Sequence, residues 1–286
     1  MYFKHFLVIF LNMNLFAQDK PISKSTYFLG LILILVLAYL QYIINGLTAV
    51  TSAILVYALP ILIISLLMGG VIVRKSFRNT GKALKLGLVY FAIFSIITIA
   101  LSALIFYILE RLDPSSLELL NNPNPVESVS PGFAWIMVFV SLIIIGPVEE
   151  YIFRGYVFGG LLNIFRGRRW LLLAFISSLV FAAVHLYYAL IYGFAASIAF
   201  TDLVGIGMAL AITYYLSGGN LLIPALLHGS YDAIGYIGIA MQPQVASFLR
   251  YVMIGVGLLI ALILLLKKLF RGSASSSMKF VHGDKI

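Results

Sequence analysis

The chain has 286 residues, of which 62% are hydrophobic and 10% charged, and its mean hydropathy is +1.08. This composition lies outside the range of soluble globular domains and indicates a polytopic membrane protein with one domain. The net charge of +9 falls in short basic clusters at the ends of apolar runs, so we expect topology signals and no nucleic-acid partner. The lack of cysteine excludes disulfides, thiolate metal sites and cysteine nucleophiles.

Residues 1–25 precede the first long apolar run. The stretch from Met1 to Ala17 is apolar but short for a membrane span, and it has no small-x-small cleavage pattern. We therefore expect an interfacial or poorly ordered segment there and not a signal peptide. At the other end, residues 271–286 contain a small, polar stretch and predict a flexible tail. The predicted domain is residues 26–270.

Eight apolar runs are long enough to cross a bilayer, because about 20 helical residues span its roughly 30 Å hydrocarbon core. The runs cover residues 26–46, 50–73, 86–109, 132–153, 170–188, 194–217, 221–240 and 247–266. The sequence therefore predicts an all-α fold. We expect a single bundle of about eight transmembrane helices, surrounded by membrane lipids, in a multi-pass integral membrane protein.

The basic clusters between the runs fall on one side of the membrane if all eight runs cross. They are Lys20 and Lys24 before the first run, Arg74 to Lys85 after the second, Arg166 to Arg169 after the fourth and Lys267 to Arg271 after the eighth. By the positive-inside rule this side is cytoplasmic, with both termini inside. The acidic loop at residues 110–131 lies on the opposite side.

The fourth run contains three charged side chains, Glu149, Glu150 and Arg154, within six residues. A charge at membrane depth costs roughly 2.5–3.5 kcal/mol on insertion scales, so we expect the interior there to be polar and functional. On a helix, Glu150 and Arg154 lie at i and i+4 and can form an ion pair, whereas Glu149 points about 100° away. One carboxylate is then neutralised, and the other is left to act as a general base.

Two further polar pairs interrupt apolar runs at helical spacing. Phe181 and His185 lie four residues apart in the fifth run, and His228 and Asp232 lie four residues apart in the seventh. A lone buried histidine is more often a hydrogen-bonded core residue. Here both histidines within the runs belong to such pairs, and carboxylates and imidazoles come from three separate runs. This pattern favours a functional cluster.

Other polar and aromatic residues carry weaker signals. Asp202 is a lone carboxylate in the sixth run, where it could line a cavity or bind a coupling ion. Tyr187, Tyr188 and Tyr192 are predicted to form an aromatic belt at the membrane interface and not to contact a substrate.

The spacing from the basic turns predicts the depth of the cluster. Glu149 and His185 each lie 16 residues, about 24 Å, from the basic turn between the fourth and fifth runs, so their heights match. His228 lies only eight residues past Asn220, so a matching depth requires the basic hairpin to protrude roughly 10 Å into the cytosol. We therefore expect a polar cavity that opens toward the cytosolic side.

Together the motifs resemble the CPBP family of intramembrane proteases, which includes the type II CAAX prenyl proteases and bacterial Abi-type relatives. The family pattern is EExxxR, then FxxxH, then HxxxN or HxxxD, on separate helices of an eight-span core. Here it reads Glu149-Glu150 with Arg154, Phe181 with His185, and His228 with Asp232. The likeness covers residues 133–240 closely.

The resemblance implies an intramembrane endopeptidase that cuts a peptide or lipidated protein near the cytosolic membrane face without a covalent intermediate. Glu149 would be the general base that activates a water molecule, with His185 as its partner. Arg154 would hold Glu150 and thereby fix the helix face. Phe181 would support the site.

His228 and the residue four positions on would stabilise the oxyanion of the tetrahedral intermediate. Prenyl proteases carry Asn at the second position, which can donate a hydrogen bond, whereas an ionised Asp232 only accepts one. We therefore expect Asp232 to orient a cationic His228. This departure favours the broader family over prenyl-protein maturation.

Three alternatives remain at this stage. Glu149, His185 and His228 could ligate zinc with a fourth position left for water, although the spacing is not HExxH and we favour a mechanism without a cofactor. A transporter or proton-coupled channel also uses intramembrane Glu, His and Asp, but a relay needs polar steps through the full thickness, and these residues cluster at one depth. A catalytically silent immunity-type relative is the third alternative, and the intact motifs argue against it.

Overall fold

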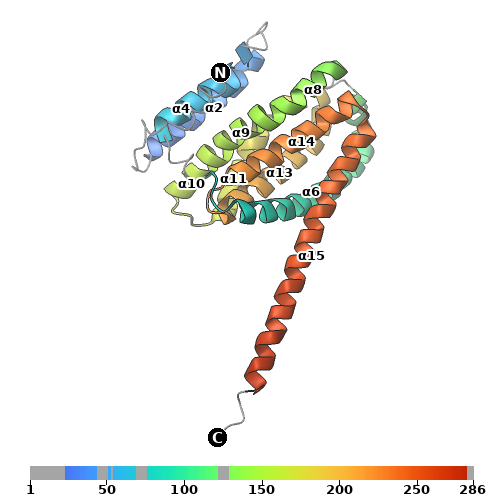
Figure 1. Cartoon of the computed structure of the whole chain (residues 1–286). Coiled ribbons are helices and arrows are strands. Elements are labelled where there is room, and N and C mark those ends of the chain that lie inside the picture. The colour runs from blue at the N-terminus through green and yellow to red at the C-terminus, as the bar shows by residue number, and fades with distance from the viewer. Residues whose placement is uncertain (1–22, 44–50, 53, 69–75, 122–128, 282–286) are drawn as a thin grey trace.

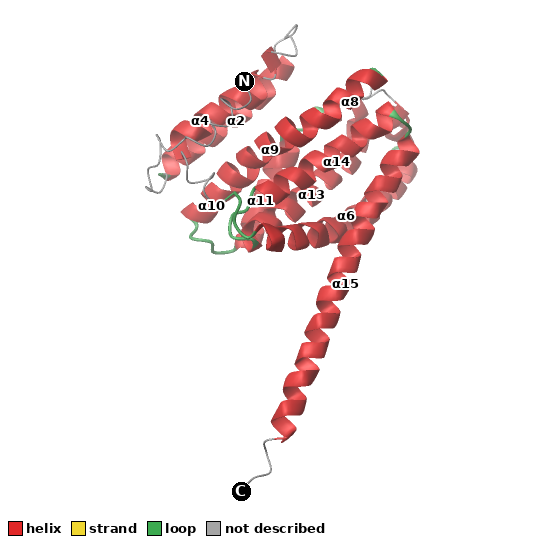
Figure 2. Cartoon of the chain, viewed as in Figure 1, coloured by secondary structure: helices red, strands yellow, loops and turns green. Residues whose placement is uncertain are grey.

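The computed structural model describes residues 23–43, 51–52, 54–68, 76–121 and 129–281, and these residues form helices joined by short connections (Figure 1). Within this part of the chain there is no strand (Figure 2), which confirms the predicted all-α class. Residues 1–22, which make up most of the predicted N-terminal segment, lie outside the described residues.

The helical elements follow one another along the chain, with η marking π-helical or 3₁₀ segments. In the first part they are α2 (Lys24–Ile43), η2 (Ile54–Ala58), α4 (Leu59–Met68), α6 (Thr80–Leu112), α7 (Pro114–Glu118) and η3 (Leu119–Asn121). The long central helix consists of α8 (Pro131–Val140), η4 (Ser141–Ile145), α9 (Gly146–Glu150), η5 (Tyr151–Phe158) and α10 (Gly159–Ile164). The last part contains α11 (Trp170–Ala183), α12 (Tyr188–Tyr192), η6 (Gly193–Ala195), α13 (Ala196–Leu216), α14 (Leu222–Ala240) and α15 (Pro243–Val281).

Several of these helices have the length and composition of membrane spans. Four stretches in the described residues are long and apolar enough to cross a bilayer: Thr80–Leu112, Pro131–Ile164, Tyr188–Leu216 and Pro243–Leu269. Shorter apolar helices occupy Lys24–Leu40, Ile54–Leu67 and Trp170–Ala183. These helices indicate an integral membrane protein, and the count of about eight crossings stays a prediction.

Polar caps explain where two of the site-bearing helices begin. The hydroxyl of Ser130 accepts a hydrogen bond from the backbone N–H of Phe133 at 3.3 Å, and Pro131 occupies the first turn of α8. The side-chain oxygen of Asn220 accepts one from the backbone N–H of Ile223 at 3.0 Å at the start of α14. Each cap satisfies a backbone donor that has no partner within its own helix.

The central helix changes its winding around the glutamates. The π-helical segments η4 and η5 flank α9, which carries Glu149 and Glu150. The sequence predicts a kink at Gly146-Pro147, because proline has no N–H to donate to the preceding turn. In the structure a wide π-helical turn precedes the proline, and such turns are frequent at functional sites.

The central helix and α14 cross with their backbones in contact. A Cβ atom on Gly146 would lie 2.6 Å from the backbone nitrogen of Gly229, and one on Gly229 would lie 2.5 Å from the carbonyl oxygen of Ser141. Because any larger residue would separate the helices, glycine at both positions permits the close approach. The crossing brings the end of α9 next to the middle of α14.

A reciprocal pair of tyrosine hydrogen bonds ties α2 to η5. The hydroxyl of Tyr27 donates to the carbonyl oxygen of Val157 at 2.7 Å, and that of Tyr156 donates to the carbonyl oxygen of Tyr27 at 2.8 Å. The ring of Tyr27 lies directly above Gly160, where a Cβ would be 2.2 Å from it. The layer formed by α2 and α4 is thereby held against the central helix (Figure 1).

Several connections gather at one end of the bundle, which we call the basic end. Asn79 donates to the carbonyl oxygen of Ser217 at 3.1 Å, which joins the segment before α6 to the turn between α13 and α14. Trp170 stacks on Tyr215 at 4.4 Å and adds the turn between α10 and α11. The basic side chains at this end are Arg78, Lys82, Lys85, Arg166, Arg168 and Arg169.

The opposite end, called the far end, contains the loop that joins α11 to α13 and the loop that follows α6. A Cβ on Gly193 would lie 3.1 Å from Leu119, so these two loops are in contact. The connection from α14 to α15, at residues 241–242, also lies at this end, because α14 begins at the basic end. The charged residues described here are Glu110, Arg111, Asp113 and Glu118.

Helix α15 begins at the far end and packs on α6 and α14, and its later part extends away from the bundle (Figure 1). The helix continues to Val281. It therefore includes much of residues 271–286, for which the sequence predicts a flexible tail. The division into a domain at 26–270 and a tail stays a prediction.

Candidate active site

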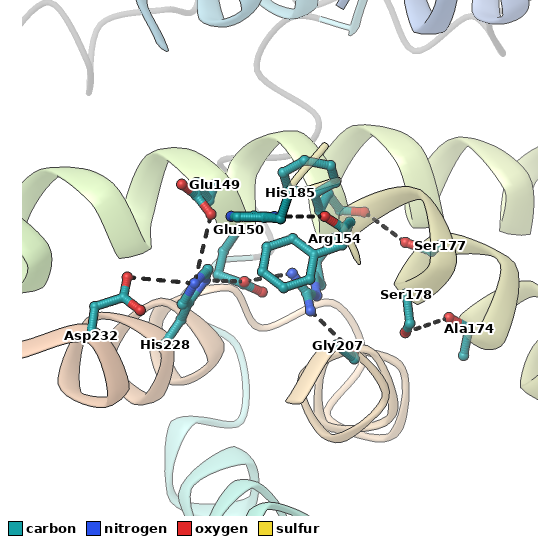
Figure 3. Close-up of polar contacts among 12 residues, drawn as sticks. Glu149, Glu150, Arg154, Ala174, Ser177, Ser178, His185, Gly207, His228 and Asp232 are labelled. Atoms are coloured by element: carbon teal, nitrogen blue, oxygen red, sulfur yellow. Dashed lines mark hydrogen bonds and ion pairs between the residues drawn. The ribbon is translucent and has the colours of Figure 1, made fainter. Parts of the chain in front are cut away.

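The structure gathers the predicted polar residues into one cluster (Figure 3). The central helix, α11 with the turn after it, and α14 contribute Glu149, Glu150, Arg154, Phe181, His185, His228 and Asp232. The predicted turn between the central helix and α11 is also observed, since α10 ends at Ile164 and α11 begins at Trp170.

Glu150 and Arg154 form the buried ion pair that their spacing predicts. Arg154 Nη1 donates to Glu150 Oε1 at 2.7 Å, and the two side chains are 1% and 0% exposed. Arg154 Nη2 also donates to the backbone carbonyl of Gly207 on α13 at 3.1 Å. Its guanidinium lies 4.8 Å from the centre of the Phe181 ring, within the range of a cation–π contact. Arg154 therefore links three helices.

His228 is hydrogen-bonded to Glu150 and forms a longer ion pair with Asp232. Its Nδ1 lies 2.8 Å from Glu150 Oε1, a hydrogen-bond distance. Its Nε2 lies 3.6 Å from Glu149 Oε2 and 3.7 Å from Asp232 Oδ2, which are ion-pair distances but too long for hydrogen bonds. The expectation that Asp232 orients a cationic His228 stays a prediction, and the hydrogen bond to His228 comes from Glu150. Because α9 and α14 cross closely at Gly146 and Gly229, Glu150 comes within hydrogen-bond distance of His228.

Glu149 has a different environment from its neighbour. Its side chain is 13% exposed, compared with 0% for Glu150, and it faces a cavity. The hydroxyl of Tyr57, on η2, donates to Glu149 Oε1 at 3.3 Å. Sequence reasoning missed Tyr57, because a single tyrosine in an apolar run shows no spacing that relates it to a motif.

Replacing Tyr57 by Phe is expected to lower the activity of the site. A hydrogen bond to a charged group contributes about 1.5–3 kcal/mol, so the loss should be about tenfold to a hundredfold, with the fold intact. Steady-state kinetics on purified protein measure it. The matched control is Tyr107→Phe on the exposed surface of α6, which should leave the rate unchanged. An equal effect in both variants would mean that the hydroxyl of Tyr57 does not act on Glu149.

His185 follows the last turn of α11, and its Nδ1 lies 3.0 Å from the carbonyl oxygen of Phe181. The ring of Phe181 lies 5.2 Å from that of His185 and 5.4 Å from that of His228, edge to face in both cases. Phe181 therefore separates the two imidazoles and fixes their relative position. Its role as a supporting residue stays a prediction.

A cavity of about 420 Å³ adjoins the cluster and is lined by side chains from seven helical elements, η4, α9, α11, α12, α13, α14 and α15. Its polar lining includes Glu149, His185, Asp202, His228, Asp232 and Arg250. The equal spacing of Glu149 and His185 from the basic turn is consistent with their shared cavity. Tyr187, Tyr188 and Tyr192 also line it, and their place in an aromatic belt at the membrane interface stays a prediction.

The cavity extends from the cluster toward the far end. Its lining includes no residue of α10, none of α13 beyond Ile206 and none of α14 before His228. Lining residues instead come from the loop after α11, the first half of α13, the second half of α14 and the start of α15. The cavity therefore occupies the far half of the bundle, which counting residues from a turn could not show, since it gives depth but not which half is filled. Its expected opening toward the cytosolic side stays a prediction.

The predicted alternative of a zinc site finds no matching geometry. Among the described residues, no group of three or more His, Cys, Asp or Glu side chains is arranged to hold a metal ion. Glu149, His185 and His228 line one cavity without forming such a group. Independence from metal stays a prediction.

Replacing Gly146 by Ala is expected to disrupt the site. The new methyl group would lie 2.5–2.8 Å from backbone atoms of α14, which cannot move aside as a side chain would. Overpacking of this kind costs about 1–3 kcal/mol and would separate Glu150 from His228. Thermal unfolding and activity measure the two effects. Gly132→Ala, on the same helix with nothing near its Cβ, is the control and should change neither.

Fold and site together indicate an integral membrane protein with a buried carboxylate–imidazole cluster beside an internal cavity. Residues 131–234 match the family model described as type II CAAX prenyl endopeptidase Rce1-like. The match includes every predicted site residue and supports the assignment to the CPBP family of CAAX-type proteases. No curated protein and no solved structure matches the chain.

Proposed function

We propose that the protein is an intramembrane endopeptidase in which Glu149 activates the water molecule that attacks the peptide bond. The observation that carries this proposal is the contrast between two adjacent glutamates. Glu150 is fully buried and bound by Arg154 and His228, whereas Glu149 faces the cavity without a cation at hydrogen-bond distance among the described residues. A general base needs a carboxylate that can reach water and take a proton from it, as Glu149 can.

In the proposed reaction Glu149 takes a proton from water, and the resulting hydroxide attacks the carbonyl carbon of the scissile bond. His185, which lines the same cavity, orients this water. Glu149 then gives the proton to the amine of the leaving peptide as the carbon–nitrogen bond breaks. Water is thus divided between the new carboxyl and amino termini, and no covalent enzyme intermediate is formed.

His228 is suited to stabilise the oxyanion. Its Nδ1 is occupied by Glu150, so its Nε2 faces the cavity between two carboxylates. Carboxylates on three sides favour a ring protonated on both nitrogens, and Nε2–H would then donate to the developing negative charge. Removing such a donor costs about 3–4 kcal/mol in other hydrolases. Arg154 and Glu150 act as positioning residues for this ring.

The surroundings of the cavity suggest where an apolar part of a substrate would bind. A second cavity of about 240 Å³ shares His185, Tyr188 and Leu203 with the first and is otherwise lined mainly by apolar side chains. We expect this cavity to hold an apolar side chain or a lipid group attached to the peptide. A lipidated peptide should therefore be cleaved faster than the same peptide without its lipid.

The test uses purified protein in detergent with a fluorogenic farnesylated peptide and its unprenylated twin. Wild type should cleave the peptide bond, prefer the lipidated form and be indifferent to a chelator, and His185→Ala should be inactive but folded. Loss of activity with the chelator would replace the proposed mechanism by a metal-dependent one. No cleavage of any peptide would favour a catalytically silent relative or a transporter. The apolar packing of the basic half argues against a transporter, because it leaves no polar route across the membrane there.

A further inference from the structure

The direction in which the cavity opens has a consequence for the substrate. Side chains of the basic half of the bundle are packed into a core that separates the cluster from the basic end. Its members include Tyr156, Phe158, Leu161, Leu173, Leu210 and Leu221, each at most 6% exposed. A peptide cannot reach Glu149 through this core without unfolding it.

The far half contains a polar route instead. Asp232 has a side chain 28% exposed, and Asp202, Tyr236 and Arg250 line the same cavity between the cluster and the far end. Arg250 is exposed and lies 5.2 Å from the ring of Tyr231, beside the cavity. Charged side chains at membrane depth are found where water reaches them, so the cavity is hydrated from this end.

The charge of the connections indicates which end faces the cytosol. Six described arginine and lysine side chains lie at the basic end, whereas the far end has three carboxylates, Arg111 and, seven residues into α15, Arg250. Lysine and arginine next to membrane spans are retained on the cytosolic side, and carboxylates contribute little to this preference. The long helix α6 connects the two ends, since it begins beside Arg78 and ends at Leu112.

We propose that the catalytic cavity opens on the non-cytosolic side of the membrane, so that the substrate is a peptide segment presented from that side. The substrate class is therefore an exported or membrane-anchored peptide. This inference rests on the proposed function for the identity of the substrate. The side of the membrane from which the cavity can be reached is a property of the fold, and it can be measured without any enzymatic activity.

The lack of cysteine allows a direct test with single-cysteine variants of the full chain. Gly235→Cys places a thiol in the cavity, at a position where a Cβ meets nothing within 4 Å. Ser115→Cys, on the exposed surface of α7, reports the far end, and Asn163→Cys, exposed near the end of α10, reports the basic end. Intact cells are treated with a membrane-impermeant maleimide, before and after permeabilisation.

We expect Gly235→Cys and Ser115→Cys to be labelled in intact cells and Asn163→Cys to be labelled only after permeabilisation, with at least a tenfold difference in labelling. Labelling of Gly235→Cys together with Asn163→Cys would overturn the proposal, as would labelling of Asn163→Cys in intact cells. A Gly235→Cys thiol that reacts only in denatured protein would also overturn it, because the cavity would then be closed.

A second experiment separates this inference from the proposed function. Proteoliposomes with the protein in one orientation, sorted by the Ser115→Cys label, receive the peptide only on the outside. Cleavage should occur when the far end faces outward and not when the basic end does. Cleavage from the basic side would refute the access proposal while the protease assignment survives. Absence of cleavage with correct labelling would refute the protease assignment alone.

Discussion

Replacing Glu149 by Gln is expected to lower the rate of peptide hydrolysis by about two to four orders of magnitude, the usual contribution of a general base. Gln keeps the shape of the side chain and can still contact Tyr57 but cannot take a proton from water. The side chain of Glu149 is partly exposed and makes no hydrogen bond to an arginine or lysine among the described residues, so the free energy of unfolding should change little. Single-turnover kinetics on the cleaved peptide measure the change.

Glu118→Gln, an exposed glutamate on α7, is the matched control for the removal of one carboxylate and should retain full activity. A Glu149→Gln variant that keeps more than about a tenth of the wild-type rate would contradict the proposed role. In that case Asp232, which also faces the cavity, would become the candidate base.

Replacing Arg154 by Met is expected to have the largest effect on stability. It would leave the carboxylate of Glu150 fully buried and held only by His228, and breaking a buried ion pair in this way costs about 3–5 kcal/mol. The bond to the carbonyl of Gly207 on α13 would be lost as well. The temperature of unfolding in detergent should fall sharply, and activity should be lost because His228 is no longer fixed.

Arg168→Met, at an exposed position of the basic turn, removes the same charge and should change stability by at most about 0.5 kcal/mol. Arg154→Lys is the second comparison. It keeps the charge, but an ammonium cannot bond Glu150 and Gly207 with the fixed fork of a guanidinium, so stability should be intermediate. If Arg154→Met unfolds at the wild-type temperature, the pair does not hold the helices together.

Local spacing allowed the sequence to predict part of the site. The pair of Glu150 and Arg154, four residues apart on one helix, is found in the structure, and the free orientation of Glu149 follows from the same geometry. The contact between Glu150 and His228 could not be predicted, because it depends on the distance between two helices. That distance is set by Gly146 and Gly229, which are far apart in sequence and match no motif.

The contact of Tyr57 and the direction of the cavity were missed for a similar reason. Tyr57 reaches Glu149 only because α2 and α4 pack on the outside of the central helix, and hydropathy does not specify which helices are neighbours. Counting from the basic turn gave a common depth for Glu149 and His185. It could not show that large side chains fill the basic half and leave the far half open.

The π-helical segments on both sides of α9 set the rotational phase of the two glutamates. A π turn closes its hydrogen bond over one more residue than an α turn does. The residues that follow each π-helical segment therefore point in a different direction from the one they would have on a regular α-helix. Removal of a single residue from η4 would rotate α9 by about 100° relative to α8. Glu149 would then leave the cavity although every residue of the motif remained. The motif alone is therefore an incomplete signature of the site, and the length of the helix before it is part of the same specification.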